Sequence, residues 1–183
     1  MRTGSNLRKL ILTALFTVLS VVLGYLLAAV PNVELITLTV FLSGIFLGRR
    51  LGALVGCLSI LIYSLFNPFG PALPPLVIAQ AAGFALVGWT GGALQRLRIS
   101  GDRESVLISA CAGLLLTFVY DLLTTVATAV IALGGSGFLR GFGGVFIAGL
   151  IFMAIHAVSN TVIFGVAVTP ILRVAGVWER GGV

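Results

Sequence analysis

Residues 10–30 read LILTALFTVLSVVLGYLLAAV, a run of twenty-one residues without one charged side chain. A helix needs about 20 such residues to cross the apolar core of a bilayer, so this run predicts a membrane-spanning helix. Basic residues precede it, as in a signal peptide, but the run is too long for a signal sequence and no small-residue cleavage pattern ends it. We therefore expect a retained first helix.

The rest of the chain has the same composition as this first run. Of its 183 residues, 59% are hydrophobic and only 9% are charged, and the mean hydropathy is +1.20. Soluble domains carry roughly 25% charged residues, so this chain could not cover a water-facing surface. At about 20 residues per crossing, its length suits six spans. We predict an all-α integral membrane protein, a six-helix transmembrane bundle that forms one domain over residues 1–183.

Proline, glycine and polar stretches divide the chain into six helices. We expect them at about residues 7–30, 34–47, 51–66, 75–97, 105–133 and 142–174. The second and third are short and could form one re-entrant hairpin. That arrangement would put Arg49 and Arg50 at the bilayer midplane, which is unfavourable, so two short spans joined at the surface are the better interpretation.

The basic residues predict the orientation of these helices. With six spans, the N-terminus, residues 48–51, residues 97–104 and the C-terminus share one face, and that face holds ten of the eleven basic residues. Only Arg140 falls on the other face. Lysine and arginine concentrate on the cytoplasmic side, so both termini should be cytoplasmic. No basic face with interleaved aromatic residues is present, so we expect no nucleic-acid partner.

Polar side chains within so apolar a bundle are the main functional signal, because such residues are rare in membranes unless they pair or bind something. Five of the six expected helices place polar groups toward the outer half. Asp121, for example, lies about 25 Å along its helix from the cytoplasmic side. We expect a shared substrate-binding site there. The candidate residues are Glu34, Tyr63, Asn67, Gln80, Asp121, His156 and Asn160.

Each candidate also has a purely structural explanation. Glu34 suits a helix N-terminus, His156 could be a satisfied core histidine, and Tyr63 and Gln80 could be interfacial or interhelical contacts. If a site forms, two carboxylates and no deep basic residue favour a ligand that donates hydrogen bonds or carries positive charge. Aromatic residues that could add a wall are Tyr63, Phe66, Phe69 and Trp89.

Glycines recur at every fourth position across the second and third helices, at Gly44, Gly48, Gly52 and Gly56. Small residues at this spacing let helix backbones approach closely in lipid. The pattern favours internal packing, and a contact face for a partner protein is the alternative.

The sequence offers little for catalysis. One histidine and scattered carboxylates lack metal-ligand spacing, and neither a nucleotide-binding loop nor a hydrolase motif occurs. We expect no enzyme activity, no metal and no cofactor. An energised transporter would need separate ATPase subunits or an ion gradient.

Four segments carry a family resemblance: LRKLILTALFTV (7–18), PNVELIT (31–37), FLGRRLGA (46–53) and YSLFNPFG (63–70). With six short helices and cytoplasmic termini, the chain resembles the substrate-binding S components of energy-coupling factor (ECF) vitamin transporters. The resemblance extends over essentially the whole chain.

The resemblance implies a function and partners. S components of bacterial cell membranes bind a vitamin or related micronutrient at the outer side, mainly through helices 4 to 6 and the first loop. They pair with a transmembrane coupling protein and two ATPase subunits, which use the ATP, and are thought to topple to release substrate. The family carries an AxxxA pattern on the coupling face of helix 1; here Ala14 matches the first position and Val18 fills the second.

Two other functions remain open. A structural or assembly subunit of a membrane complex would use its polar residues to pair with one another or with a partner. A solitary gradient-driven transporter would need a titratable residue near the midplane, and His156 is the only plausible one.

Overall fold

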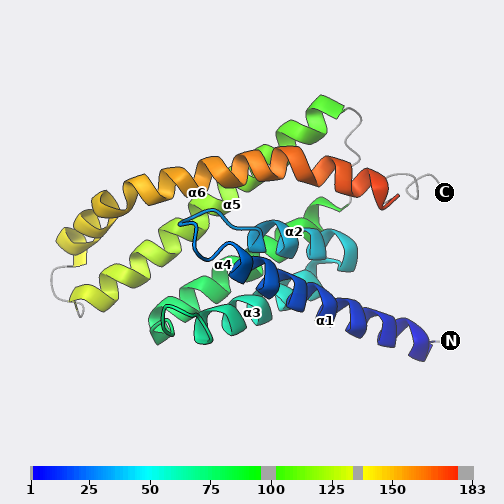
Figure 1. The fold of residues 1–183 in the computed structure, drawn as a ribbon, viewed down its shortest axis with the longest axis horizontal. Coiled ribbons are helices and arrows are strands. Elements are labelled where there is room, and N and C mark those ends of the chain that lie inside the picture. Colours follow the sequence, from blue (N-terminus) through cyan, green and yellow to red (C-terminus); the bar gives the residue numbers. More distant parts are fainter. Residues whose placement is uncertain (1, 96–101, 134–137, 177–183) are drawn as a thin grey trace.

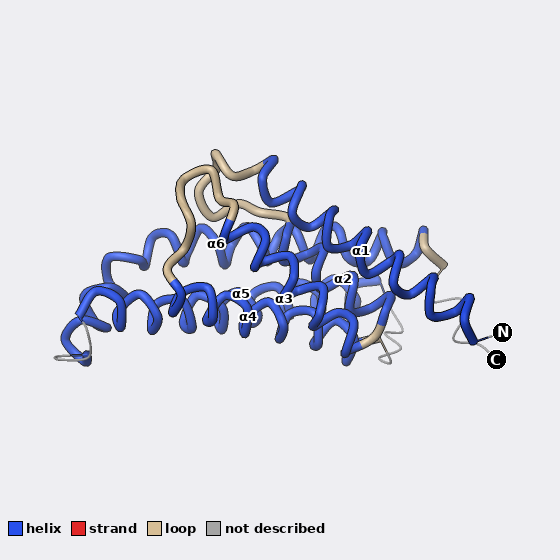
Figure 2. The backbone as a smooth tube through the Cα atoms, turned by 90° about the horizontal axis from the view of Figure 1, so that it is seen from below, coloured by secondary structure: helices blue, strands red, loops and turns tan. Residues whose placement is uncertain are grey.

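The computed structural model describes residues 2–95, 102–133 and 138–176, which form six helices and no strand (Figures 1 and 2). The helices are α1 (Arg2–Leu26), α2 (Ile36–Leu47), α3 (Arg49–Leu65), α4 (Pro74–Leu94), α5 (Asp102–Leu133) and α6 (Phe138–Val174). The predicted all-α fold is confirmed.

Four helices in the described ranges are long and apolar enough to cross a membrane: α1, α4, α5 and α6. The 12 residues of α2 span only about 18 Å, and the 17 residues of α3 about 26 Å. Both fall short of the roughly 30 Å apolar core of a bilayer. The start of α1 and the end of α6 lie at the same end of the bundle (Figure 1), as an even number of crossings requires. Six crossings and cytoplasmic termini stay predictions.

Some helix boundaries differ from the expected ones. α1 ends at Leu26, because residues 27–33 form tight turns in which Val30 N–H donates to the Leu27 carbonyl (2.8 Å). α6 begins at Phe138, four residues earlier than expected. The polar segment 96–101 and the glycine turn 134–137, both used to place boundaries, lie outside the described residues.

The core of the molecule is α2, which packs against α1, α3, α4 and α6. Residues 36–45 of α2 are all buried, as expected for a helix that is apolar on every side. Phe41 of α2 packs against Phe164 of α6, with ring centroids 5.1 Å apart, and Val40, Val55 and Val87 fill the space beside them. A helix this short can remain in the membrane because protein covers it.

The glycine series serves internal packing. A Cβ on Gly44 or Gly52 would clash with the Gly88 backbone of α4, and one on Gly56 would clash with α4 one turn away. Gly48 instead adopts a φ of +88° in the α2–α3 turn, a conformation that favours glycine. Of the two interpretations offered by the spacing, close contact between helices of this chain is the one observed.

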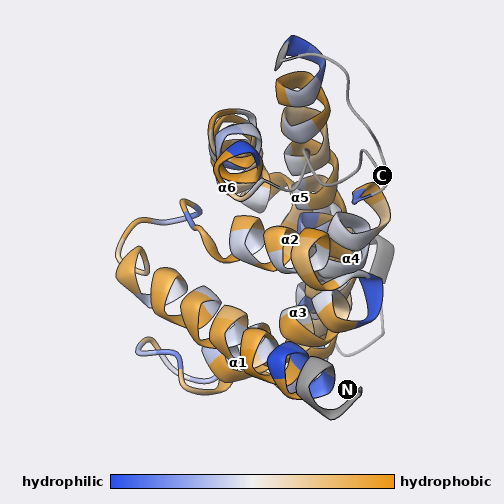
Figure 3. Ribbon diagram, turned by 90° about the vertical axis from the view of Figure 1, so that its right-hand side faces the viewer, coloured by the Kyte–Doolittle hydropathy of each residue, from blue (hydrophilic) through white to orange (hydrophobic). Residues whose placement is uncertain are grey.

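Large apolar side chains cover the outside of the bundle. Leu10, Ile78 and Val166, from three different helices, are each about two-thirds exposed (67%, 70% and 69%). Figure 3 shows hydrophobic residues along the outward helix faces and hydrophilic residues at helix ends, such as the start of α5. Exposure on this scale would be unfavourable in water and suits lipid.

Candidate functional site

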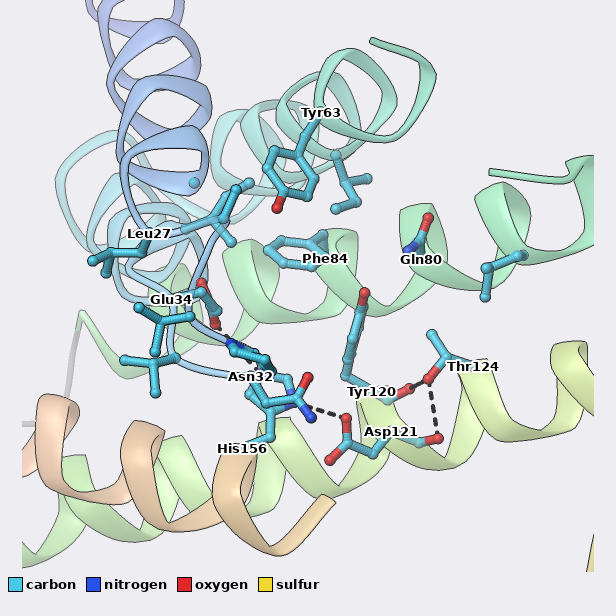
Figure 4. A pocket seen from close by; sticks show the side chains of 18 of the residues that line it. Leu27, Asn32, Glu34, Tyr63, Gln80, Phe84, Tyr120, Asp121, Thr124 and His156 are labelled. Carbon is cyan, nitrogen blue, oxygen red and sulfur yellow. Dashed lines mark hydrogen bonds and ion pairs between the residues drawn. The ribbon is translucent and has the colours of Figure 1, made fainter. Parts of the chain in front are cut away.

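A cavity of about 400 Å³ lies between the α1–α2 loop and helices α3 to α6 (Figure 4). It is at the end of the bundle where α1 and α3 end and α4 begins, which is the predicted outer side. Its polar and aromatic lining residues are Asn32, Glu34, Tyr63, Gln80, Phe84, Tyr120, Asp121, Thr124, Thr128 and His156. Five of the seven predicted site residues are among them.

The α1–α2 loop covers this cavity and is attached to α6. The Asn32 side-chain amide donates to the Phe152 carbonyl (2.9 Å), and the Ser159 hydroxyl donates to the Asn32 carbonyl (2.9 Å). Asn32 has a φ of +58°, which asparagine tolerates better than most residues. These two bonds position the residues that follow, including Glu34.

Glu34 is both a helix cap and a cavity residue. Its Oε2 accepts a hydrogen bond from the Thr37 backbone N–H (2.8 Å) at the start of α2. Its Oε1 accepts one from the Asn160 side-chain amide (3.1 Å) and faces His156 Nε2 at 3.5 Å. Burial alone would raise the pKa of Glu34, but the hydrogen bonds and charge of His156 and the hydrogen bond from Thr37 lower it below its ordinary value. These contacts favour the carboxylate form of Glu34.

Asp121 and His156 form a buried polar pair in the site. Asp121 Oδ1 on α5 lies 2.8 Å from His156 Nδ1 on α6, and both residues are buried. Because the second ring nitrogen faces Glu34, His156 has a carboxylate on each side. An imidazolium, which has two N–H donors, matches both. Within the described ranges, no three residues of the His, Cys, Asp and Glu types are arranged to hold a metal ion.

Asn160 does not line the cavity, but it contacts Glu34, which does. Its side chain is fully buried and donates to Glu34 and to the Thr117 hydroxyl (2.9 Å). It lies one helical turn after His156, on the same face of α6. Its structural effect is to orient the Glu34 carboxylate.

The aromatic wall consists of Tyr63, Phe84 and Tyr120 (Figure 4). Phe84 and Tyr120 meet edge to face with centroids 5.2 Å apart, and the Tyr120 ring meets the His156 ring at 5.9 Å in the same way. Gln80 closes the other side of the cavity, where its Oε1 accepts a hydrogen bond from Ser64 (2.8 Å).

Three of the four aromatic residues predicted for this wall do not line the cavity. Phe66 and Phe69 are 74% and 79% exposed, and Trp89 stacks under Arg49 (5.1 Å) away from the cavity. Asn67 does not line the cavity either: its Oδ1 accepts a hydrogen bond from Phe69 N–H in the turn after α3.

Helical spacing could have identified cavity-lining residues that were not predicted from the sequence. Phe84 is one turn after Gln80 on α4, and Thr124 and Thr128 lie three and seven residues after Asp121 on α5. Residues three, four or seven apart share a helix face. Extending each face from the predicted polar residue would have found them.

Ala14 and Val18, the predicted coupling-subunit interface, lie on an outward face of α1. Both are exposed, and Val18 is 60% exposed. A neighbouring face of α1, about 100° around the helix, presents the buried residues Thr13 and Thr17 to the bundle. Neither Ala14 nor Val18 lines the cavity.

Comparison with known proteins agrees with this architecture. Residues 8–177 match the family model described as "ECF transporter, substrate-specific component". Comparisons with curated proteins and with solved structures gave no match. Because the family match spans nearly the whole chain, the chain belongs to the substrate-specific components of ECF transporters, which are substrate-binding membrane subunits and not enzymes.

Proposed function

We propose that this chain captures a vitamin or related micronutrient from the outer side of a bacterial cell membrane and delivers it for ATP-driven ECF-type uptake. The observation that carries the proposal is the cavity of about 400 Å³ lined by Glu34, Asp121 and His156. Pockets for small molecules combine apolar walls with a few convergent polar groups, and this cavity has both.

The proposal assigns the energy source to other subunits. The chain has one lysine and no nucleotide-binding loop, so hydrolysis of ATP would occur on two separate ATPases. A transmembrane coupling protein would connect them to this chain through the α1 face that carries Ala14 and Val18. Toppling would bring the cavity from the outer side to the cytoplasmic side.

Mass spectrometry of the detergent-purified chain tests the binding step. A vitamin-sized molecule should be retained by the wild-type protein and lost from the Asp121→Ala variant, while Glu104→Ala, which removes an acid outside the cavity, should retain it. Proteoliposomes that contain the chain, the coupling protein and the ATPases should then take up that molecule only with ATP inside.

The outcomes separate the competing functions. Uptake that persists without the ATPases and stops with a protonophore would identify a gradient-driven transporter and overturn the proposal. A chain that retains no molecule and supports no uptake, yet is required for assembly of a membrane complex, would be a structural subunit.

A further inference from the structure

The cavity also indicates which class of substrate it would hold. We infer that the substrate is a flat aromatic or heteroaromatic molecule with a positive charge, bound with its cationic end beside Asp121 and Glu34 and its ring against Tyr63, Phe84 and Tyr120. This inference rests on the proposed function, because it concerns the same cavity.

The charge of the lining is the first argument. Among the residues that the structure describes, two carboxylates and one histidine line the cavity, and no lysine or arginine does. If both carboxylates are ionised, the lining carries one net negative charge with His156 as an imidazolium and two with His156 neutral. Either state favours a cation and disfavours an anion.

Four basic residues that the structure describes can be placed away from this cavity. Lys9, Arg49 and Arg50 line a different cavity of about 420 Å³, where the α2–α3 turn meets the end of α4. Arg140 precedes His156 by sixteen residues on α6, about 24 Å along the helix. A carboxylate or phosphate group in the acidic cavity would therefore find no lysine or arginine among the described lining residues, and His156 already faces two carboxylates.

The existing hydrogen bonds leave acceptors for a ligand donor. Asp121 uses Oδ1 for His156, so the lone pairs of its second oxygen can accept from an ammonium or ring N–H group. The hydroxyl oxygens of Tyr63 and Tyr120 can accept as well. A carboxylate that accepts a charged donor makes the stronger class of hydrogen bond.

The aromatic residues argue for a ring. Tyr63, Phe84 and Tyr120 come from three different helices and line the same cavity, and Figure 4 shows them above the side chains of Asp121 and His156. Aromatic faces attract cations and stack with flat rings. A molecule that is charged at one end and flat along its length contacts both parts of the lining.

Three compounds that share one ring but differ in charge provide the test. Calorimetric titration of the detergent-purified full chain would compare 1-methylnicotinamide (a cation), nicotinamide (neutral) and nicotinate (an anion) at one pH and ionic strength. We expect the cation to bind at least tenfold more tightly than the neutral compound, and the anion to bind most weakly.

Two isosteric variants connect the preference to the carboxylates. Glu34→Gln retains an oxygen for the Thr37 cap, and Asp121→Asn retains an acceptor for His156, so both should fold. Each should reduce the ratio of cation to neutral affinity by tenfold or more, and Glu104→Gln should leave the ratio unchanged. Because the ratio is measured within one variant, a general loss of stability would not produce this result.

The inference would be overturned if nicotinate bound as tightly as 1-methylnicotinamide or more tightly. It would also be overturned if 1-methylnicotinamide did not bind at millimolar concentration. The proposed function is tested separately, by mass spectrometry of any molecule that the purified chain retains. A retained neutral or anionic vitamin would refute the charge assignment and leave the proposed function standing, whereas an empty protein without uptake would refute both.

Discussion

His156 connects three parts of the chain that are distant in sequence. It lies on α6, and its ring lies between Asp121 of α5 and Glu34 of the α1–α2 loop. Removing one member of a buried charged set leaves the others uncompensated, which typically costs about 3–5 kcal/mol. The same three residues therefore contribute to the shape of the cavity and to its charge.

Asp121→Ala should lower the affinity for the retained ligand by tenfold or more, equivalent to about 1.4 kcal/mol. The variant loses a carboxylate that faces the cavity and leaves His156 Nδ1 without its 2.8 Å partner. Equilibrium binding to the purified variant measures the effect, with Glu104→Ala as the control. Unchanged affinity would remove Asp121 from the binding site.

Residue chemistry made part of the site predictable. A carboxylate, an imidazole and an amide cannot face lipid without a large penalty, so Asp121, His156 and Asn160 had to face protein, and the structure places them together. Aromatic residues are tolerated both in lipid and in a cavity. Their type therefore did not reveal that Phe84 lines the cavity while Phe69 is exposed.

The α1–α2 loop is the element that closes the cavity, and its attachment to α6 is short and polar. Asn32→Gly keeps the backbone conformation at φ +58° but removes the hydrogen bond to Phe152. Asn32→Ala removes the bond and adds left-handed strain of about 1 kcal/mol. Both should speed ligand dissociation, the alanine variant more, in stopped-flow or surface-plasmon measurements.

Ser159→Ala provides an independent check on the loop, because it removes the second hydrogen bond from the α6 side. It should raise the dissociation rate in the same direction as the Asn32 variants. If Asn32→Ala and Ser159→Ala both leave the dissociation rate unchanged, the loop does not control ligand release.

The close contact between α3 and α4 requires a residue without a side chain at position 88. A Cβ on Gly88 would clash with the backbone of Gly52, and neither helix can move away without separating both from α2. Gly88→Ala should destabilise the protein by about 3 kcal/mol. Thermal unfolding in detergent measures this, and Gly149→Ala is the matched control because its Cβ would meet nothing nearer than the Met153 sulfur at 4.0 Å.

Helix positions were predictable from apolar runs, but the environment of α2 was not. Its twelve residues, ITLTVFLSGIFL, are apolar on every side, a pattern that fits a lipid-exposed span as well as a buried helix. The buried state arises because Gly44 and Gly88, which are forty-four residues apart, allow α4 to approach closely. Such a pairing cannot be read from either segment alone.

Across the whole molecule, the proposed binding cavity and the proposed coupling face lie apart. The cavity lies within the bundle, whereas Ala14 and Val18 face outward from α1. If this face contacts the coupling protein, Ala14→Trp should abolish co-purification with that protein and leave ligand affinity unchanged. Val166→Trp, an equally bulky change at a 69% exposed position of α6, is the control. Intact complexes of the Ala14→Trp variant would place the interface elsewhere.

The charge distribution of the whole molecule sets its expected orientation, because ten of eleven basic residues fall on the face predicted to be cytoplasmic. A variant free of Cys57 and Cys111 allows a direct measurement. With a membrane-impermeant maleimide, Phe69→Cys should react on intact cells, since Phe69 is 79% exposed near the cavity end. Arg50→Cys, in the turn at the other end, should react only after permeabilisation.

The reverse pattern would invert the topology, and would place the acidic cavity on the cytoplasmic side, where it could not capture an external solute. If Arg50→Cys reacts in neither condition, α2 and α3 form a re-entrant hairpin whose turn stays within the membrane.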